Sequence, residues 1–221
     1  MDAEERYVDR RERMVAEQIA RRMIDNQRVL EAMRTVPRHR FVPAEFVDKA
    51  YEDRPLQIGE SQTISQPYIV GLMTELLALR SGEVVLEVGT GSGYQSAVLA
   101  ELVQQVYTIE RHQSLADQAR KTLAELGFQN VTVIEGDGSG GLPEHAPYDG
   151  ILVTAAAPEV PREILEQLKD GGRLVIPVGG YGGQTLELWQ RKGDHFEHQS
   201  IVPVAFVPLR GEHGWEKDWY D

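Results

Sequence analysis

Residues 84–94 read VVLEVGTGSGY, and this stretch decides the fold. Its first five residues are aliphatic apart from Glu87, as is typical of a parallel strand that is buried on both faces. Gly89, Gly91 and Gly93 follow at once, and glycine lets a backbone turn tightly and approach a ligand closely. A helix is expected over residues 96–102. The stretch therefore predicts a strand, a ligand-binding turn and a helix, which begin a nucleotide-type α/β domain.

The chain downstream repeats this alternation. We expect strands at Val106–Ile109, Val131–Ile134, Tyr148–Thr154 and Arg173–Val178, and helices at Ser114–Leu126 and Pro161–Leu168. Such an alternation predicts a mainly parallel, doubly wound, Rossmann-like sheet. The last two apolar runs, Thr185–Gln190 and Ser200–Val207, leave no room for a crossover helix and are expected to be antiparallel edge strands.

Upstream of the glycine turn the pattern is helical over residues 5–36. Apolar residues recur there at helical spacing, and a helix cap is expected at Asp25 or Asn26; the residues of the first apolar stripe are Val15, Ile19, Met23 and Ile24. The basic cluster Arg38-His39-Arg40 is expected to form a solvated turn, because charged residues are mostly exposed. We therefore divide the chain into an N-terminal helical cap with a substrate and cofactor loop (1–80) and an α/β core with an antiparallel edge (81–221), within one compact unit.

Composition narrows the class of partner. The formal net charge of the 221 residues is −12, which disfavours nucleic acid as a partner because phosphates would be repelled. The chain has no cysteine, its N-terminus has no apolar signal-peptide core, and no apolar run approaches the length of a membrane span. We expect a cytoplasmic, monomeric enzyme that binds no membrane.

The residues around the glycine turn distinguish two classes of cofactor. The dinucleotide fingerprint GxGxxG/A needs a small sixth residue, and here that position is Tyr94. Glu87 would sit badly beside a diphosphate but suits a methionine moiety that carries an ammonium and a sulfonium. The pattern ExGxGxG over residues 87–93 therefore favours S-adenosylmethionine over NAD.

Two further acidic residues follow predicted strands. Glu110, about 20 residues beyond the glycine turn, is placed to accept hydrogen bonds from both ribose hydroxyls of a nucleoside. Asp137 could accept from an adenine amino group, and Gly138 would let the adenine ring lie against the backbone. We expect these groups to meet at one edge of the sheet.

Other motifs carry a resemblance to a known family. Residues 59–70 read GESQTISQPYIV, and supporting motifs are VPR at 36–38, FVP at 41–43, GDG at 136–138 and FVPL at 206–209. In these stretches, from about Arg38 to Leu209, the chain resembles the protein-L-isoaspartate O-methyltransferases. Ser61 departs from the family pattern, which usually has glycine there, so a left-handed backbone is expected to be absent or strained at this position.

The resemblance implies a function and a set of residues. It implies methyl transfer from S-adenosylmethionine, giving S-adenosylhomocysteine, to the free α-carboxylate of L-isoaspartyl residues in damaged proteins and peptides; the ester then collapses to a succinimide. Ser65 matches the family's active-site position, and Gln62, Thr63 and Ile64 are implied to line the cofactor. Ser65 is also expected to be the N-cap of the following helix, whose amides suit a carboxylate.

Alternative functions remain open at this point. A methyltransferase for a small molecule or a nucleic acid would share the core, and a non-catalytic binding module could retain the pocket, although it would not need Glu87, Glu110, Asp137 and Ser65 together. No metal site is expected, since His195 and His198 fit a solvated turn. The edge segment 204–207 is expected to pair with the substrate backbone by strand addition. The tail Gly211–Asp221 matches no motif and is either a sheet-covering extension or a mobile end.

Overall fold

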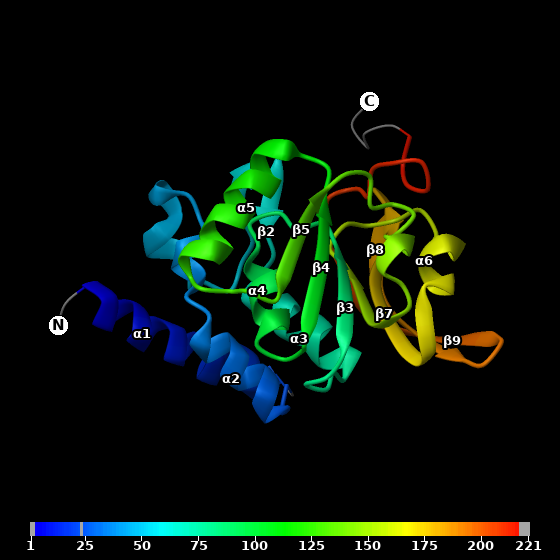
Figure 1. Ribbon diagram of the computed structural model, residues 1–221. Helices are drawn as coiled ribbons and strands as arrows, with labels where there is room; N and C mark the ends of the chain where they lie inside the picture. Colours follow the sequence, from blue (N-terminus) through cyan, green and yellow to red (C-terminus); the bar gives the residue numbers. More distant parts are fainter. Residues whose placement is uncertain (1–2, 23, 217–221) are drawn as a thin grey trace.

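A seven-stranded sheet forms the centre of the molecule in the computed structural model, which describes residues 3–22 and 24–216 (Figure 1). The strands, in spatial order, are β5 (Val131–Glu135), β4 (Gln105–Glu110), β3 (Val84–Val88), β6 (Tyr148–Val153), β7 (Leu168–Gly180), β8 (Gly183–Lys192) and β9 (His195–Val204). The first five are parallel to one another, whereas β8 pairs antiparallel with β7 and β9 pairs antiparallel with β8. The predicted doubly wound sheet with an antiparallel edge is confirmed.

Helices cover both faces of this sheet. The helices of the core are α3 (Pro67–Leu77), α4 (Tyr94–Ala100), α5 (Gln113–Glu125) and α6 (Arg162–Glu166). Alternate residues of β3 enter different apolar cores: Val85 joins the core that contains α3 and α4, while Leu86 and Val88 join the core that contains α6. This burial on both faces explains why residues 84–88 are almost continuously aliphatic.

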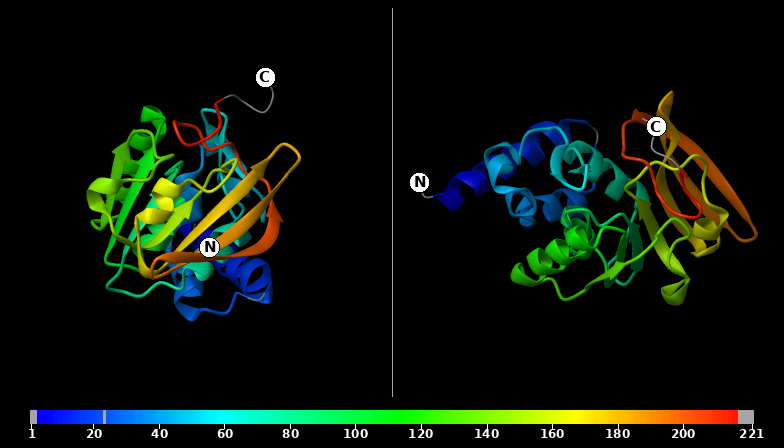
Figure 2. Two further views of the ribbon diagram at one scale, coloured as in Figure 1. Left: turned by 90° about the vertical axis from the view of Figure 1, so that its right-hand side faces the viewer. Right: turned by 90° about the horizontal axis from the view of Figure 1, so that it is seen from above.

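The helical cap is built from α1 (Ala3–Arg13), a π-helical turn (Met14–Ile19), a 3₁₀ turn (Ala20–Arg22) and α2 (Gln27–Thr35). Asn26 is the N-cap of α2, with its side chain accepting from the Arg28 amide at 3.0 Å, so one of the two expected caps is confirmed. Met23 lies outside the described residues. The cap and the β8–β9 hairpin lie at opposite ends of the molecule (Figure 2).

The prediction of a solvated turn at 38–40 is wrong for two of its three residues. Arg38 is fully buried and His39 is 6% exposed. Arg38 donates to the carbonyl oxygens of Ala50 and Ser65, and His39 Nδ1 lies 2.8 Å from the hydroxyl of Tyr51. These polar partners offset the cost of taking both side chains out of water, and sequence composition alone does not reveal them.

A short hairpin connects the cap to α3. Its strands are β1 (Leu56–Gly59) and β2 (Gln62–Ile64), and the two residues between them, Glu60 and Ser61, have φ values of 49° and 56°. Two consecutive left-handed residues form the turn that suits a two-residue hairpin loop. The left-handed backbone is therefore present at Ser61, without the glycine that would adopt it most easily.

The end of the last strand bears on function. β9 ends at Val204, three residues before the predicted end of the edge strand, and residues 205–207 leave the sheet. Within the described ranges, the helices are too short or too polar to cross a membrane.

Candidate active site

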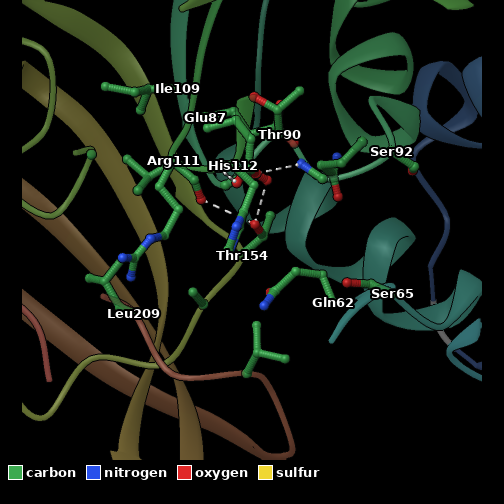
Figure 3. A pocket seen from close by; sticks show the side chains of 18 of the residues that line it. Gln62, Ser65, Glu87, Thr90, Ser92, Ile109, Arg111, His112, Thr154 and Leu209 are labelled. Carbon is green, nitrogen blue, oxygen red and sulfur yellow. Dashed lines mark hydrogen bonds between the residues drawn. The ribbon is translucent and has the colours of Figure 1, made fainter. Parts of the chain in front are cut away.

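A cavity opens at the carboxyl ends of β3, β4 and β6, where the direction of the strand order reverses. This is the position at which open α/β sheets bind ligands. The predicted site residues that line it are Gln62, Thr63, Ile64, Ser65, Glu87, Gly89, Gly91, Glu110 and Gly138. Figure 3 shows Gln62 and Ser65 on one side of the cavity, with Glu87 and Thr90 across from them. The structure thus brings together residues that are far apart in the sequence, such as Gln62 and Glu87.

The glycine turn has the conformation that its sequence predicts. Gly89, Gly91 and Gly93 have φ values of 95°, 53° and 86°, which residues with a Cβ rarely adopt. Gly93 does not line the cavity: it precedes α4, and a Cβ there would lie 3.3 Å from the Cβ of Ala119 in α5. Its contribution to the site is close packing of the helices behind the turn.

Glu87 is fully buried at the end of β3. Its Oε2 accepts hydrogen bonds from the hydroxyls of Ser96 and Thr108, the latter at 2.7 Å, whereas its Oε1 has no partner among the described residues. Burial raises the pKa of Glu87 to about 8, and the nearby charge of Glu110 acts in the same direction, while the two hydroxyl bonds oppose the shift. An unpartnered buried acceptor beside a cavity is suited to a cationic ligand.

Glu110 supports the glycine turn from the end of β4. Its Oε2 accepts from the Gly91 amide and its Oε1 accepts from the His112 amide, both at 2.9 Å, and the residue is 5% exposed. Each carboxylate oxygen has a second lone pair, so two donors from a ligand can still be accepted. Glu110 therefore combines a structural task with the predicted ligand-binding one.

Of the two predicted site residues that follow β5, Gly138 lines the cavity and Asp137 does not. Gly138 lines the cavity, and a Cβ there would lie 2.6 Å from Ile109 Cγ2 and 2.9 Å from Val88 Cγ1, so no larger residue fits. Asp137 is not among the residues that line the cavity. Its Oδ1 accepts from the Ser139 amide and its Oδ2 from the Glu212 amide, both at 2.9 Å, and the pKa of Asp137 is lowered by these amide bonds against a partial burial that would raise it.

The prediction that Ser65 is a helix N-cap is wrong. Helix α3 begins at Pro67 with Gln66 as its N-cap, and no side chain of the N-cap residue makes a capping bond. The Tyr68 amide instead donates to Asp53 Oδ1 at 3.2 Å, a cap supplied from a distant part of the sequence. This amide is consequently not free to hold a substrate carboxylate.

Several residues of the cavity wall escaped sequence reasoning. They are Thr90, Ser92, Arg111, His112, Thr154, Leu209 and Arg210. Thr154 Oγ1 donates to the Gly89 carbonyl at 2.6 Å and so fixes the start of the turn. The position of Thr154 as the last residue of the predicted strand Tyr148–Thr154 was the available signal, because parallel strands end at one edge of the sheet.

The tail over residues 211–216 covers the same edge. The Glu212 amide is bound by Asp137, and the indole nitrogen of Trp215 donates to the Ala156 carbonyl at 3.0 Å. Of the two alternatives for the tail, the described part is thus an extension packed on the strand ends. Trp219 and Tyr220 lie outside the described residues.

A second cavity adjoins the first. Both are lined by Thr63, Ser65, Thr154 and Val207, and the second also by Gln66, Ile69 and residues 203–206 of the edge segment. Ser65 therefore lies where the two cavities meet. In the part of the chain that the structure describes, no group of histidines and carboxylates is arranged to hold a metal ion.

Comparisons with known proteins agree with this geometry. A family model described as protein-L-isoaspartate(D-aspartate) O-methyltransferase matches residues 9–214. The chain is 56% identical to the protein-L-isoaspartate O-methyltransferase of Methanoregula boonei over 94% of this chain and 96% of that protein. For the enzyme of that name from a Synechococcus strain, the identity is 54% over 94% of this chain and 88% of that protein.

Solved structures give the same result. A protein-L-isoaspartate O-methyltransferase structure superposes with a TM-score of 0.84 at 30% identity, over 92% of this chain and 67% of that one. A Plasmodium falciparum structure in complex with S-adenosyl-L-homocysteine has a TM-score of 0.79 at 24% identity, over 90% of this chain and 98% of that one, which shows a shared fold. The chain belongs to the protein-L-isoaspartate(D-aspartate) O-methyltransferase family.

Proposed function

We propose that the main cavity binds S-adenosylmethionine and that the chain methylates the free α-carboxylate of L-isoaspartyl residues in damaged proteins and peptides. Family membership supports this reaction. The cofactor assignment is supported most directly by Glu87: its buried Oε1 has no hydrogen-bond partner among the described residues. An uncompensated buried acceptor is costly, and an ammonium donor would satisfy it.

The remaining residues fit the rest of the cofactor. Glu110 is placed to accept two ribose hydroxyls, and the Gly138 backbone lines the cavity while it packs closely against Ile109 and Val88. Gln62, Thr63 and Ile64 line the cavity, as do Gly89 and Gly91, while Gly93 acts from behind the turn. For Asp137 the structure supports a different task, since its two oxygens hold the Ser139 amide and the tail.

The main task of the protein in methyl transfer is to place the acceptor carboxylate against the methyl group. When bound, S-adenosylmethionine supplies an electrophilic methyl group on a sulfonium. The acceptor carboxyl has a pKa of about 4 and is ionised at pH 7, so no residue has to remove a proton. Attack by an anion on a cation cancels charge, which makes alignment and exclusion of water the main contributions of the enzyme. Ile64, Val207 and Leu209 provide apolar walls for this purpose.

Ser65 is the residue that we place at the acceptor carboxylate. It lines both cavities, and its hydroxyl makes no hydrogen bond to the described residues, so it is free to donate to the substrate. The loss of one bond to a charged group corresponds to about 1.5–3 kcal/mol, or about 10- to 150-fold in kcat/KM. Ser65→Ala should show this loss in methyl transfer to an isoaspartyl peptide.

A matched control is Ser81→Ala, because Ser81 lies in a turn outside both cavities and its hydroxyl accepts only a 3.3 Å bond from Arg28. That variant should keep its activity. Full activity of Ser65→Ala together with normal folding would remove Ser65 from the proposed mechanism.

The acceptor peptide is proposed to lie in the second cavity. Only part of the predicted strand addition survives, because the amide and carbonyl of Phe206 are both bonded to the side chain of Gln184 and the Val207 carbonyl accepts from Ala156. The main chain of Ala205, just beyond β9, has no hydrogen bond to the described residues and is the remaining candidate for pairing. Main-chain pairing would let the enzyme accept many damaged proteins.

Two properties of the whole chain complete the proposal. The net charge of −12 supports protein acceptors rather than nucleic acid. We further propose that the enzyme acts as a cytoplasmic monomer.

A further inference from the structure

Arg38 lies fully buried between the helical cap and the proposed acceptor site. Its Nε donates to the Ala50 carbonyl at 2.7 Å and its Nη2 donates to the Ser65 carbonyl at 2.8 Å. The guanidinium carbon lies 4.9 Å from the ring centroid of Tyr94, and Tyr94 lines the main cavity. Arg38 itself lines neither cavity, so any effect on the reaction must pass through the residues that it holds.

This burial is not explained by packing alone. Removing a cation from water is costly, and the described residues include no carboxylate within ion-pair distance of Arg38. Burial lowers the pKa of Arg38 to about 10, while Tyr94, Tyr51 and Asp53 nearby act in the opposite direction, so the guanidinium stays charged at neutral pH. An apolar side chain would fill the space without this cost but could not join the carbonyls of residues 50 and 65. The planar guanidinium of Arg38, which carries several N–H donors, can join these two carbonyls.

The residues next to Ser65 are held from another direction by Asp53. Its Oδ2 accepts from the Gln66 side chain and from Arg22, both at 2.8 Å, and its Oδ1 accepts from the Tyr68 amide. The main chain of Ser65 is consequently fixed between Arg38 on one side and the residues bonded to Asp53, which are Gln66 and Tyr68, on the other. Because the Ser65 hydroxyl itself has no protein partner among the described residues, its position depends on this main-chain support.

We propose that Arg38 is a positioning residue for methyl transfer. By binding the Ser65 carbonyl it sets where the Ser65 hydroxyl stands at the junction of the two cavities. This inference rests on the proposed role of Ser65. It explains why a buried charge is kept at this position: the guanidinium fixes the geometry of the acceptor site.

Arg38→Met and Arg38→Lys test this inference. Methionine removes both bonds, and a displacement of about 1 Å at a reacting group lowers turnover about 100-fold. We expect Arg38→Met to lose about 100-fold in kcat for an isoaspartyl peptide at saturating S-adenosylmethionine. Arg38→Lys keeps the charge but can reach fewer carbonyls, and should recover about tenfold of that loss. The Kd for S-adenosylhomocysteine should change less than about threefold in both variants, because Arg38 does not itself line the cofactor cavity.

The control is Arg28→Met, because Arg28 also joins the cap to the core through carbonyls. It donates to the carbonyl oxygens of Leu79 and Leu102, and none of these three residues lines either cavity. Arg28→Met should lower the melting temperature in the same way as Arg38→Met and leave kcat unchanged. If both variants lose kcat equally, or if Arg38→Met loses cofactor affinity as much as kcat, Arg38 is a structural residue and the inference is overturned.

A double-mutant cycle with Ser65→Ala separates this inference from the proposed role of Ser65. If Arg38 acts by placing the Ser65 hydroxyl, the loss caused by Arg38→Met should shrink from about 100-fold to less than about tenfold once that hydroxyl is absent. Equal losses in both backgrounds would overturn the inference while leaving Ser65 in place. An unchanged rate for Ser65→Ala alone would instead refute the role of Ser65. Should Arg38→Met fail to fold, the same cycle is run with Arg38→Lys, and a folded Arg38→Lys with full kcat contradicts the inference.

Discussion

The carboxylate of Glu110 accepts a 2.9 Å hydrogen bond from the amide of Gly91, so the acid at the end of β4 holds the glycine turn that follows β3. This relationship changes what is expected of Glu110→Ala. The variant should lose about 1.5–3 kcal/mol of cofactor binding, as a lost bond to a charged group implies. It should also lower the melting temperature, because the amides of Gly91 and His112 lose their acceptor. Calorimetry with S-adenosylhomocysteine and a thermal melt measure the two effects.

Glu135→Ala is the matched control for Glu110→Ala. Glu135 ends β5 directly beside Glu110 in the sheet, but it is exposed and does not line the cavity. It should keep both affinity and stability. A Glu110→Ala variant with unchanged affinity and reduced stability would leave Glu110 with only its structural task.

Cofactor binding should depend on pH through Glu87. The pKa of Glu87 is about 8 in the ligand-free protein because the side chain is buried, so near neutral pH the carboxyl mostly holds a proton. A bound ammonium favours the ionised form, which means that binding below pH 8 must release this proton. The affinity for S-adenosylhomocysteine should therefore weaken about tenfold for each pH unit below 8 and level off above it.

Calorimetry between pH 6 and pH 8.5, in buffers of different ionisation enthalpy, measures both the affinity and the released proton. Glu87→Gln should bind more weakly at high pH and show no pH dependence over this range. Equal affinity of the parent protein at pH 6 and pH 8, with no proton release, would contradict the pairing of Glu87 with an ammonium.

NAD should not bind in place of S-adenosylmethionine. Tyr94 occupies the position where the dinucleotide fingerprint needs a small residue, and it is buried against Phe41 and beneath Arg38. Glu87 adds an acidic side chain, which cannot stabilise the negative charge of a diphosphate in either protonation state. Titration calorimetry should detect S-adenosylhomocysteine and give no heat with NAD. Tight NAD binding would end the cofactor assignment.

Ser61→Gly should stabilise the protein. Ser61 has a φ of 56°, which costs a residue with a Cβ about 1–2 kcal/mol, while glycine gives back about 0.5–1 kcal/mol in the entropy of the unfolded chain. The net gain of about 0.5–1 kcal/mol should raise the melting temperature by about 1–4 °C. Ser81→Gly, at a turn with negative φ, should give no such gain. A lower melting temperature for Ser61→Gly would show that this backbone is not strained.

Local patterns explain the parts of the fold that could be predicted. The strand of residues 84–88, the glycine turn and the antiparallel edge each follow from neighbouring residues, because burial on two faces and positive φ leave direct marks in sequence. The same reasoning placed Glu87 and Glu110 at the cavity, since parallel strands end at a common edge. Gln62, Thr63, Ile64 and Ser65 were found through a family motif rather than through physical reasoning.

Long-range partners explain the parts that could not be predicted. The cap of α3 comes from Asp53 rather than from Ser65, and the burial of Arg38 depends on carbonyls at residues 50 and 65. Asp137 is likewise bound by the Glu212 amide from the far end of the chain. None of these partners is adjacent in sequence to the group that it satisfies, so base rates for charged and capping residues pointed to the wrong roles.

Methylation of isoaspartyl carboxylates by this chain is tested most directly by methyl transfer to a pair of peptides that differ only in one linkage. The purified protein is incubated with labelled S-adenosylmethionine and either the isoaspartyl or the aspartyl form of one peptide, and the base-labile methyl ester is counted. We expect label in the isoaspartyl peptide, none above background in the aspartyl peptide, and a reduced rate with Ser65→Ala. Equal labelling of both peptides, or of neither, by a protein that binds S-adenosylhomocysteine would contradict this expectation.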